Sequence, residues 1–322
     1  MPRTRLAPSP TGALHLGNAR TFLVNWALAR QRGWEILLRI DDLDGPRIKR
    51  DAAAEAIDIL QWLGIDWDEG PVYQTADLAP YRAALASLAA RGLAYPCHCT
   101  RSQILAASLS APHEGEHELR YPGTCRPAFN PPPPYSGEGL GEGALNDPTC
   151  AWRFRVPDGP IEFNDDFAGP QSHDVDATVG DFLIATKGDL PSYQLAVVVD
   201  DARQGITHIV RGDDLLTSTP RQLLLYRALN LGPPPSYLHL PLVKGPDGRR
   251  LAKRHGDTRL AHYRDCGVKP ERIIGLLAEW SGLGPRREMT SREFAERFEL
   301  ERLPREAVIF TTENDSWLIA DS

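Results

Sequence analysis

The chain passes from a short apolar segment, residues 4–7, into a helical pattern through the stretch Ala7-Pro8-Ser9-Pro10-Thr11-Gly12-Ala13-Leu14-His15-Leu16-Gly17-Asn18. Its prolines and small residues predict a strand that turns directly into a helix. Such a junction directs backbone N–H groups and the positive end of the helix dipole toward one point, which suits a polyphosphate. On its own, the stretch is equally consistent with a tight turn that has no chemical role.

The residues that follow alternate between helix and strand patterns. Apolar residues recur at helical spacing across residues 22–27, and Gly33 stands where that helix should end. Ile36-Leu37-Leu38-Arg39-Ile40 then has the composition of a buried strand, and helical patterns return at residues 52–64 and 80–92. The succession of strand, helix and strand predicts an α/β fold around a parallel sheet.

A second informative stretch, Arg250-Leu251-Ala252-Lys253-Arg254, follows the turn residues Pro246-Asp247-Gly248. A loop of this composition is able to close over a ligand and bring basic side chains to it. Taken alone, however, a run of basic residues is more often a solvated face. Between the two stretches, apolar patterns predict strands at residues 182–185, 207–210 and 237–243.

Together, the two stretches resemble the paired signature motifs of class I aminoacyl-tRNA synthetases. His15-Leu16-Gly17-Asn18 resembles the HIGH motif, and the stretch at 250–254 resembles the KMSKS motif. Four more segments look like the glutamyl branch of that class: residues 5–12, 38–44, 193–201 and 206–226. The resemblance covers most of residues 3–265 and implies a Rossmann-type class I catalytic domain.

The chemistry of that class needs no protein nucleophile. A substrate carboxylate attacks the α-phosphate of ATP, and catalysis comes mainly from positioning and from neutralising charge on phosphate oxygens. The resemblance implies that His15 donates to a phosphate oxygen, that Gly17 lets the nucleotide approach the backbone beside Asn18, and that Lys253 clamps the transition state. Mg²⁺ is expected to accompany the ATP. In isolation, His15 and Lys253 would more often be structural or solvated residues.

Arg5 and Arg211 are the candidates for binding the amino acid. A guanidinium makes strong, selective contacts with a carboxylate, and such a site rejects glutamine. The resemblance to the glutamyl enzymes implies a glutamate-binding set of Arg5, Ser9, Asp41, Tyr193 and Arg211. In that set Asp41 would hold the α-ammonium, and Tyr193 would hydrogen-bond the substrate. The alternative is that Arg211 pairs with an aspartate at 213–214 and that Tyr193 fills the core.

Two positions depart from the family pattern. Asp41 replaces the usual glutamate and is one methylene shorter, and Ala252 replaces a serine that could donate to phosphate. We expect a modest loss from Ala252, because Lys253 remains beside it.

The five cysteines are an odd number, and two of them lie in Cys97-His98-Cys99. This favours a metal site over a disulfide framework, because structural zinc prefers four ligands that include thiolates. The residues alone leave the fourth ligand open among Tyr121, His98, His113 and His117, and an empty cysteine pair is the alternative. The set Cys97, Cys99, Tyr121 and Cys125 is similar to the zinc site of glutamyl-Q tRNA(Asp) synthetases, which implies one structural Zn²⁺. Cys150 and Cys266 are expected to be buried thiols.

The subfamily is indicated by the length of the chain. Ordinary glutamyl enzymes continue into a long helical region that reads the anticodon, whereas this chain ends soon after residues 317–319. Lack of that module distinguishes the glutamyl-Q family, which esterifies glutamate to queuosine at the wobble position of tRNA(Asp). The resemblance therefore implies queuosine-containing tRNA(Asp), L-glutamate and ATP as partners. Three alternatives remain: a truncated glutamyl-tRNA synthetase charging the 3′ end of tRNA(Glu), a non-catalytic tRNA-binding paralogue, and a ligase for a small-molecule acceptor.

The composition of the chain excludes few of these possible functions. The formal net charge of −7 over 322 residues weakens the case for a nucleic-acid partner without excluding it, since basic residues still gather at 244–259. The chain lacks an apolar run of about 18 residues and a signal-like N-terminus. We therefore expect a soluble, cytoplasmic protein, active as a monomer.

We expect the chain to be organised in four parts. Residues 1–96 and 181–245 would form the two halves of the catalytic domain, 97–180 an inserted zinc-binding, acceptor-type subdomain, and 246–322 a KMSKS-like loop with a short helical module. The insertion contains a proline- and glycine-rich stretch at 130–143, which predicts a surface linker. In the last part, Thr290-Ser291-Arg292-Glu293 has the spacing of a capping box.

Overall fold

The computed structural model describes residues 1–43, 51–109, 120–127, 149–188, 190–249, 251 and 257–320. Lys253 and its neighbour Ala252 lie outside these residues, as do His113, His117 and the proline- and glycine-rich stretch.

The first half of the chain forms the expected parallel α/β unit. Strand β1 (Arg3–Leu6) leads to helix α1 (Leu16–Arg32), and β2 (Glu35–Ile40) returns beside β1 in parallel register. Helix α1 ends at Gly33, which has a left-handed φ of 64° that glycine adopts without strain. Helix α2 (Ala52–Trp62) and strand β3 (Glu69–Tyr73) follow, and β3 extends the sheet parallel to β2.

The second half supplies a four-stranded sheet in the order β7-β6-β10-β9. Its strands are β6 (Ile161–Asp165), β7 (Gly169–His173), β9 (His208–Gly212) and β10 (Ser236–Leu240). Strand β10 is parallel to both β9 and β6. The residue before β9 lies against β1, because the Thr207 N–H donates to the Arg3 carbonyl over 2.9 Å. Strands β1 and β9 therefore meet, and each carries one of the candidate arginines.

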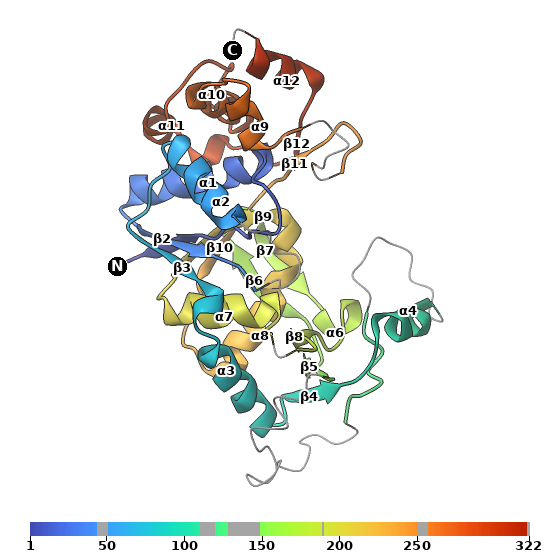
Figure 1. The fold of residues 1–322 in the computed structure, drawn as a ribbon. Coiled ribbons are helices and arrows are strands. Elements are labelled where there is room, and N and C mark those ends of the chain that lie inside the picture. The colour runs from blue at the N-terminus through green and yellow to red at the C-terminus, as the bar shows by residue number, and fades with distance from the viewer. Residues whose placement is uncertain are drawn as a thin grey trace.

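Helices cover both faces of the strands (Figure 1). Helices α1 and α2 lie on one face, next to the C-terminal helices α9 (Leu260–Asp265), α10 (Pro270–Trp280), α11 (Ser291–Arg297) and α12 (Thr312–Ile319). Helices α3 (Ala79–Ala90), α7 (Tyr193–Arg203) and α8 (Thr219–Leu229) lie on the other. The sheet separates two apolar cores: in β2, Ile36 and Leu38 belong to one and Leu37 to the other, as strand alternation requires.

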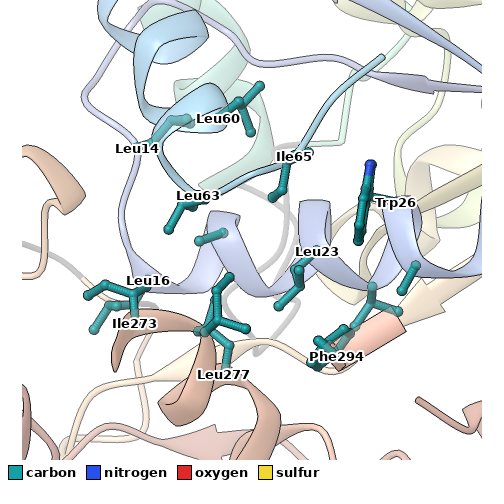
Figure 2. Packing of buried hydrophobic residues seen from close by; sticks show 14 of the residues in the cluster. Leu14, Leu16, Leu23, Trp26, Leu60, Leu63, Ile65, Ile273, Leu277 and Phe294 are labelled. Atoms are coloured by element: carbon teal, nitrogen blue, oxygen red, sulfur yellow. The ribbon is translucent and has the colours of Figure 1, made fainter. Parts of the chain in front are cut away.

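Helix α1 is buried between α2 and the C-terminal helices (Figure 2). Leu16 and Leu23 lie toward Ile273, Leu277 and Phe294, all of them buried. Helix α1, which begins within the first motif, is thus packed on two sides. Such burial is worth about 1.5–3 kcal/mol for each large apolar side chain.

The cysteines belong to a separate antiparallel sheet, with the order β4-β5-β8. Its strands are β4 (Ala94–Cys97), β5 (Ala151–Phe154) and β8 (Leu183–Ala185), accompanied by helices α4 (Arg101–Leu109) and α6 (Val175–Thr178). The described residues also form short 3-10 helices, among them η2 (Gln74–Ala76), η3 (Asp213–Ser218) and η5 (Leu300–Arg302). The boundaries expected for the four parts remain a prediction. Within 97–180, strand β6 pairs with β10 of the following segment.

Two expectations are corrected by the structure. The single strand expected at 237–243 is divided, because β10 ends at Leu240 and Pro241 has no N–H to continue a ladder. Strand β11 (Val243–Lys244) pairs instead with β12 (Val308–Ile309). Cys266 is exposed rather than buried, whereas Cys150 is buried as expected. The cap at Thr290 is confirmed, since its hydroxyl accepts the Glu293 N–H over 3.1 Å.

Candidate active site and metal centre

His15 is the N-cap of helix α1. Its Nδ1 accepts the backbone N–H groups of Gly17 and Asn18 over 3.1 and 3.4 Å, and the Asn18 side-chain oxygen accepts the His15 N–H over 3.3 Å. A neutral imidazole that accepts at Nδ1 carries its proton on Nε2. The cap therefore selects the tautomer that presents an N–H donor at the far edge of the ring.

Gly17 is required by the position of this imidazole. A Cβ at Gly17 would lie 3.1 Å from Cε1 and 3.2 Å from Nδ1 of His15, and 3.5 Å from Cβ of Val243. The first two distances are tighter than ordinary van der Waals contact. Glycine is expected at position 17 so that the nucleotide is able to approach the backbone. The structure adds a second reason for glycine, which is room for the histidine ring.

The two motif segments lie together. The N–H of Leu16 donates to the carbonyl of Thr258 over 3.1 Å, and the N–H of Leu260 donates to the carbonyl of Leu14 over 2.9 Å. Leu251 is buried in the same apolar cluster as Leu16. Both flanks of the basic segment are therefore anchored beside the N-terminus of α1, while the position of Lys253 lies outside the described residues.

Arg5 and Asp41 belong to a buried network of charges at the ends of β1 and β2. Nη1 of Arg39 donates to Asp201 over 2.7 Å, and its Nε donates to Asp41 over 2.7 Å. Nε of Arg5 donates to the same Asp201 oxygen over 3.4 Å. Burial raises the pKa of Asp41, and the positive charges of Arg39 and Arg5 oppose this effect.

Arg39 and Asp201 were not among the predicted site residues. A signal was present, because Arg39 lies inside an otherwise apolar strand and its side chain is fully buried. A buried arginine requires carboxylate partners. Burial disfavours its charge, yet the carboxylates of Asp41, Asp201 and Asp200 together raise the pKa of Arg39 well above its usual value.

Arg211 extends from β9 and is also buried. Its Nε donates to Nε2 of His239 over 2.9 Å, and its Nη2 donates to the hydroxyl of Thr219 over 2.9 Å and to the carbonyl of Leu215 over 3.4 Å. Its Nη1 is buried and has no hydrogen-bond partner among the residues that the structure describes. Two sides of the guanidinium are thus held by the protein, and one polar atom remains to receive a ligand.

Tyrosines complete the surroundings of Arg211. Tyr237 is buried, its hydroxyl has no partner, and its ring centroid lies 5.3 Å from the Arg211 guanidinium carbon. Burial raises the pKa of Tyr237, which keeps the hydroxyl protonated, and the charges of Arg211 and Arg5 act against that rise. Tyr193 begins α7 with 40% of its surface exposed, so it does not fill the core. Ser9 is exposed in the turn after β1.

Sequence reasoning also missed Tyr237 and His239. The signal available was the alternation of polar and apolar residues in Tyr237-Leu238-His239-Leu240, which places both polar side chains on one face of β10. Nothing in the sequence indicated that this face meets Arg211.

The cysteine cluster has the geometry of a metal centre. The Sγ atoms of Cys97, Cys99 and Cys125 all lie within 4.8 Å of one another, and those of Cys99 and Cys125 are 3.6 Å apart. The Tyr121 hydroxyl oxygen lies 3.5 Å from the Cys97 sulfur and 4.0 Å from the Cys99 sulfur. Tetrahedral zinc with usual bond lengths needs sulfurs about 3.8 Å apart and an oxygen about 3.5 Å from each. The donor set therefore fits Zn²⁺.

Neighbouring groups orient these donors. The backbone N–H of Cys125 donates to the Tyr121 oxygen over 2.7 Å, which directs that oxygen to the cluster. Arg153 donates from Nε to the Cys97 sulfur over 3.4 Å, and its guanidinium lies 3.7 Å from the Tyr121 ring centroid. His98 is exposed and does not belong to the three-cysteine group, and the other two candidate histidines lie outside the described residues.

Among the helices that the structure describes, none is long and apolar enough to cross a membrane.

Comparison with known proteins places this geometry in a family. A family model described as tRNA synthetases class I (E and Q), catalytic domain, matches residues 2–317. A glutamyl-Q tRNA(Asp) synthetase of Symbiobacterium thermophilum is 48% identical over 314 residues, covering 94% of each chain. A second, from Rhodopirellula baltica, is 49% identical over 292 residues, covering 87% of this chain and 85% of that protein.

Glutamate–tRNA ligases match over a smaller share of their own length. The enzyme of Syntrophobacter fumaroxidans is 40% identical over 320 residues, which are 98% of this chain and 64% of that protein. A solved glutamate tRNA ligase from Elizabethkingia meningosepticum, in complex with its amino acid, has a TM-score of 0.80 and 27% identity. That match covers 98% of this chain and 68% of that chain.

The fold and the paired motif segments define a class I tRNA synthetase catalytic domain of the glutamate and glutamine type. The protein is therefore an enzyme of the aminoacyl-tRNA synthetase type, a ligase. The long matches at 48% and 49% identity show that the chain belongs to the glutamyl-Q tRNA(Asp) synthetase family.

Proposed function

We propose that this protein activates L-glutamate with ATP and transfers the glutamate to queuosine at the wobble position of tRNA(Asp). The observation that carries glutamate as the amino acid is Arg211, a buried arginine whose Nη1 has no partner. A buried, unpartnered guanidinium edge is costly unless an anion binds there. The side-chain carboxylate of glutamate is such an anion, and glutamine is not.

In the first step, an α-carboxylate oxygen of glutamate attacks the α-phosphorus of ATP and pyrophosphate leaves. His15 supports this step as an N–H donor from Nε2 to a phosphate oxygen, because its Nδ1 is engaged by the helix. Gly17 and Asn18 lie in the first turn of α1, where the positive end of the helix dipole favours phosphate, while their own N–H groups donate to His15 Nδ1. We assign Lys253 the neutralisation of charge on the phosphates, and a Mg²⁺ ion bound with the ATP would supply the same kind of neutralisation.

The remaining groups hold the substrate. Within the described part of the chain, neither Nη group of Arg5 has a hydrogen-bond partner, so both are able to meet a carboxylate. Asp41 uses one oxygen for Arg39, and we assign its other oxygen to the α-ammonium. Tyr193 and Ser9 border the site from the start of α7 and the turn after β1.

In the second step, a hydroxyl of the queuosine ring attacks the acyl carbon, AMP leaves, and the hydroxyl proton passes to solvent. The named activity of the two relatives supports tRNA(Asp) as the acceptor. We propose that the enzyme acts as a monomer in the cytoplasm. Attack by queuosine requires the wobble base to reach the adenylate, and an unstacked anticodon base is able to enter a protein site.

We propose that Cys97, Cys99, Tyr121 and Cys125 hold one structural Zn²⁺. The support is the short mutual distances of the four donors. When bound, such an ion stabilises the fold around it and takes no part in the chemistry.

The experiment that tests the function is transfer of labelled glutamate, with ATP, to purified tRNA. Three acceptors are compared: tRNA(Asp) with queuosine, tRNA(Asp) without it, and tRNA(Glu). We expect label only on the first. Label at the 3′ end of tRNA(Glu) would instead make the protein a glutamyl-tRNA synthetase, and no label on any tRNA would contradict both.

A further inference from the structure

The buried side chain of His239 lies between Asp165 and Arg211. Nδ1 of His239 is 2.6 Å from Oδ2 of Asp165, and Nε2 is 2.9 Å from Nε of Arg211. Asp165 ends strand β6, His239 lies on β10 and Arg211 lies on β9, so three neighbouring strands contribute one residue each. All three residues are buried.

The hydrogen bonds leave only one arrangement of protons. Oδ1 of Asp165 accepts the backbone N–H groups of Phe167, Ala168 and His239 over 3.0, 2.7 and 3.2 Å, which favours the ionised carboxylate. Oδ2 then accepts the proton of His239 Nδ1. Because a neutral imidazole has one N–H, Nε2 of His239 must be an acceptor, and Nε of Arg211 supplies the N–H that it accepts.

This arrangement decides the orientation of Arg211. Its Nε is held by His239 and its Nη2 by Thr219, so the guanidinium cannot rotate without losing a buried hydrogen bond. The edge that remains is Nη1, which has no partner. The hydroxyl of Tyr237, also without a partner, belongs to the ring that faces the same guanidinium.

We propose that His239, oriented by Asp165, is a positioning residue that holds Arg211 so that its Nη1 and the Tyr237 hydroxyl together receive the side-chain carboxylate of glutamate. The inference rests on the proposed function and adds the residues that set its amino-acid specificity. Both groups are buried donors without a partner among the described residues, and a carboxylate is able to accept from both. The amide nitrogen of glutamine carries hydrogens and has no lone pair for Nη1, so an amide in the same position leaves a buried donor unpaired.

The decisive variant is Asp165→Asn. The amide oxygen preserves the contacts to Phe167 and Ala168, but the amide N–H faces Nδ1 of His239 and moves the ring proton to Nε2. Two N–H groups then oppose each other between His239 and Arg211. We expect the KM for glutamate to rise at least about tenfold and the KM for ATP to stay unchanged. The reason is that loss of one hydrogen bond to a charged group weakens binding by about this factor. The readout is glutamate-dependent exchange of labelled pyrophosphate into ATP.

A second variant, Tyr237→Phe, removes only a hydroxyl that has no hydrogen-bond partner among the described residues, so we expect folding to be preserved. We expect the ratio of kcat/KM for glutamate to that for glutamine to fall about tenfold. The matched control is Tyr263→Phe, which removes a buried hydroxyl bonded to Asp315 in the C-terminal helices. That control should leave the ratio unchanged.

The outcomes separate the two proposals. If the unaltered protein does not activate glutamate, the proposed function fails. If it does, an unchanged glutamate KM in Asp165→Asn, or an equal rise of the KM values for glutamate and ATP, overturns the positioning role of His239. An unchanged ratio in Tyr237→Phe overturns the joint binding of the carboxylate by Nη1 and the Tyr237 hydroxyl, and with it the proposal. Should Asp165→Asn not fold, the ratio in Tyr237→Phe decides alone.

Discussion

The buried arginines Arg39 and Arg211 of this site are each held from several directions at once, because a buried charge needs hydrogen-bond partners. Arg39 illustrates this, because it donates to Asp201, which also accepts from Arg5, and to Asp41, which directly follows its own strand. Removing one member of a buried ion pair costs about 3–5 kcal/mol. A charge in this position is therefore tolerated only where its partners are guaranteed by the fold.

The contact between His15 and Gly17 leads to a prediction at this scale. In Gly17→Ala, the new methyl group meets the imidazole at about 3.1–3.2 Å and displaces it from the cap. Because the Nε2 donor moves with the ring, we expect adenylate formation to slow by about tenfold or more. Glutamate-dependent pyrophosphate exchange measures the rate.

A double-mutant cycle provides the control. In a His15→Ala background the ring is absent, so Gly17→Ala should add little further loss. If the two losses are instead additive, the methyl group acts on the nucleotide directly and the explanation through the ring is wrong.

At the scale of elements, the metal cluster joins strand β4 to a segment that has no regular secondary structure. Cys97 ends β4, Cys99 follows it, and the segment at 120–127 brings Tyr121 and Cys125. Apart from these residues, the local apolar cluster is small, with Tyr95 as its largest fully buried member. A bound metal ion would therefore supply here the cohesion that a larger apolar core supplies elsewhere.

Arg153 of strand β5 gives a test of this centre. Three thiolates and a phenolate leave the zinc complex with excess negative charge, and Arg153 lies against both Cys97 and the ring of Tyr121. We expect Arg153→Met to lower the zinc affinity about 10–100-fold, the range found for groups that support metal ligands. Competition with a coloured chelator measures the affinity.

The comparison variant is Arg155→Met, two residues further along, where the buried arginine donates to the carbonyl of Pro127. This variant loses the same charge without a sulfur contact, so its zinc affinity should stay within about twofold of that of the unaltered protein. Equal losses in both variants would show that charge alone, and not the contact with Cys97, explains the effect.

At the scale of the whole molecule, Arg20 of helix α1 joins three distant segments. Its Nη1 donates to the carbonyl of Pro241 over 2.7 Å, and its Nη2 donates to the carbonyl of Trp280 over 3.0 Å. Burial lowers the pKa of Arg20 to about 10, and the charge of Asp213 partly offsets this. The guanidinium thus connects the helix after the first motif to the end of β10 and to α10.

We expect Arg20→Met to lower the free energy of unfolding by about 2–4 kcal/mol, because two buried carbonyls lose their donors. Arg20→Lys keeps the charge but has a single ammonium, so it should lose roughly half as much. Urea denaturation at neutral pH measures both. A loss below about 0.5 kcal/mol in Arg20→Met would contradict this linking role.

Much of this molecule follows from local sequence. Short apolar runs predicted β1 and β2, helical spacing of apolar residues predicted α1, and Gly33 marked the end of that helix, because such patterns and a left-handed cap depend on near neighbours. The Cys97-x-Cys99 and Tyr121-x-x-x-Cys125 spacings likewise named donors that the structure brings together. Pro241 was also a signal in the sequence that the strand expected at 237–243 is divided, since proline lacks the N–H that a strand ladder needs.

By itself, then, the sequence determined the α/β class and the family, which rest on local patterns and on motifs of neighbouring residues, and it predicted the metal donors. Only the tertiary structure decided that Asp201 serves both Arg5 and Arg39, that Gly17 makes room for an imidazole, and that Asp165 and His239 stand behind Arg211. These pairings depend on which strands become neighbours in the sheet. That order is chosen by burial of apolar faces over the whole chain, so no local pattern records it.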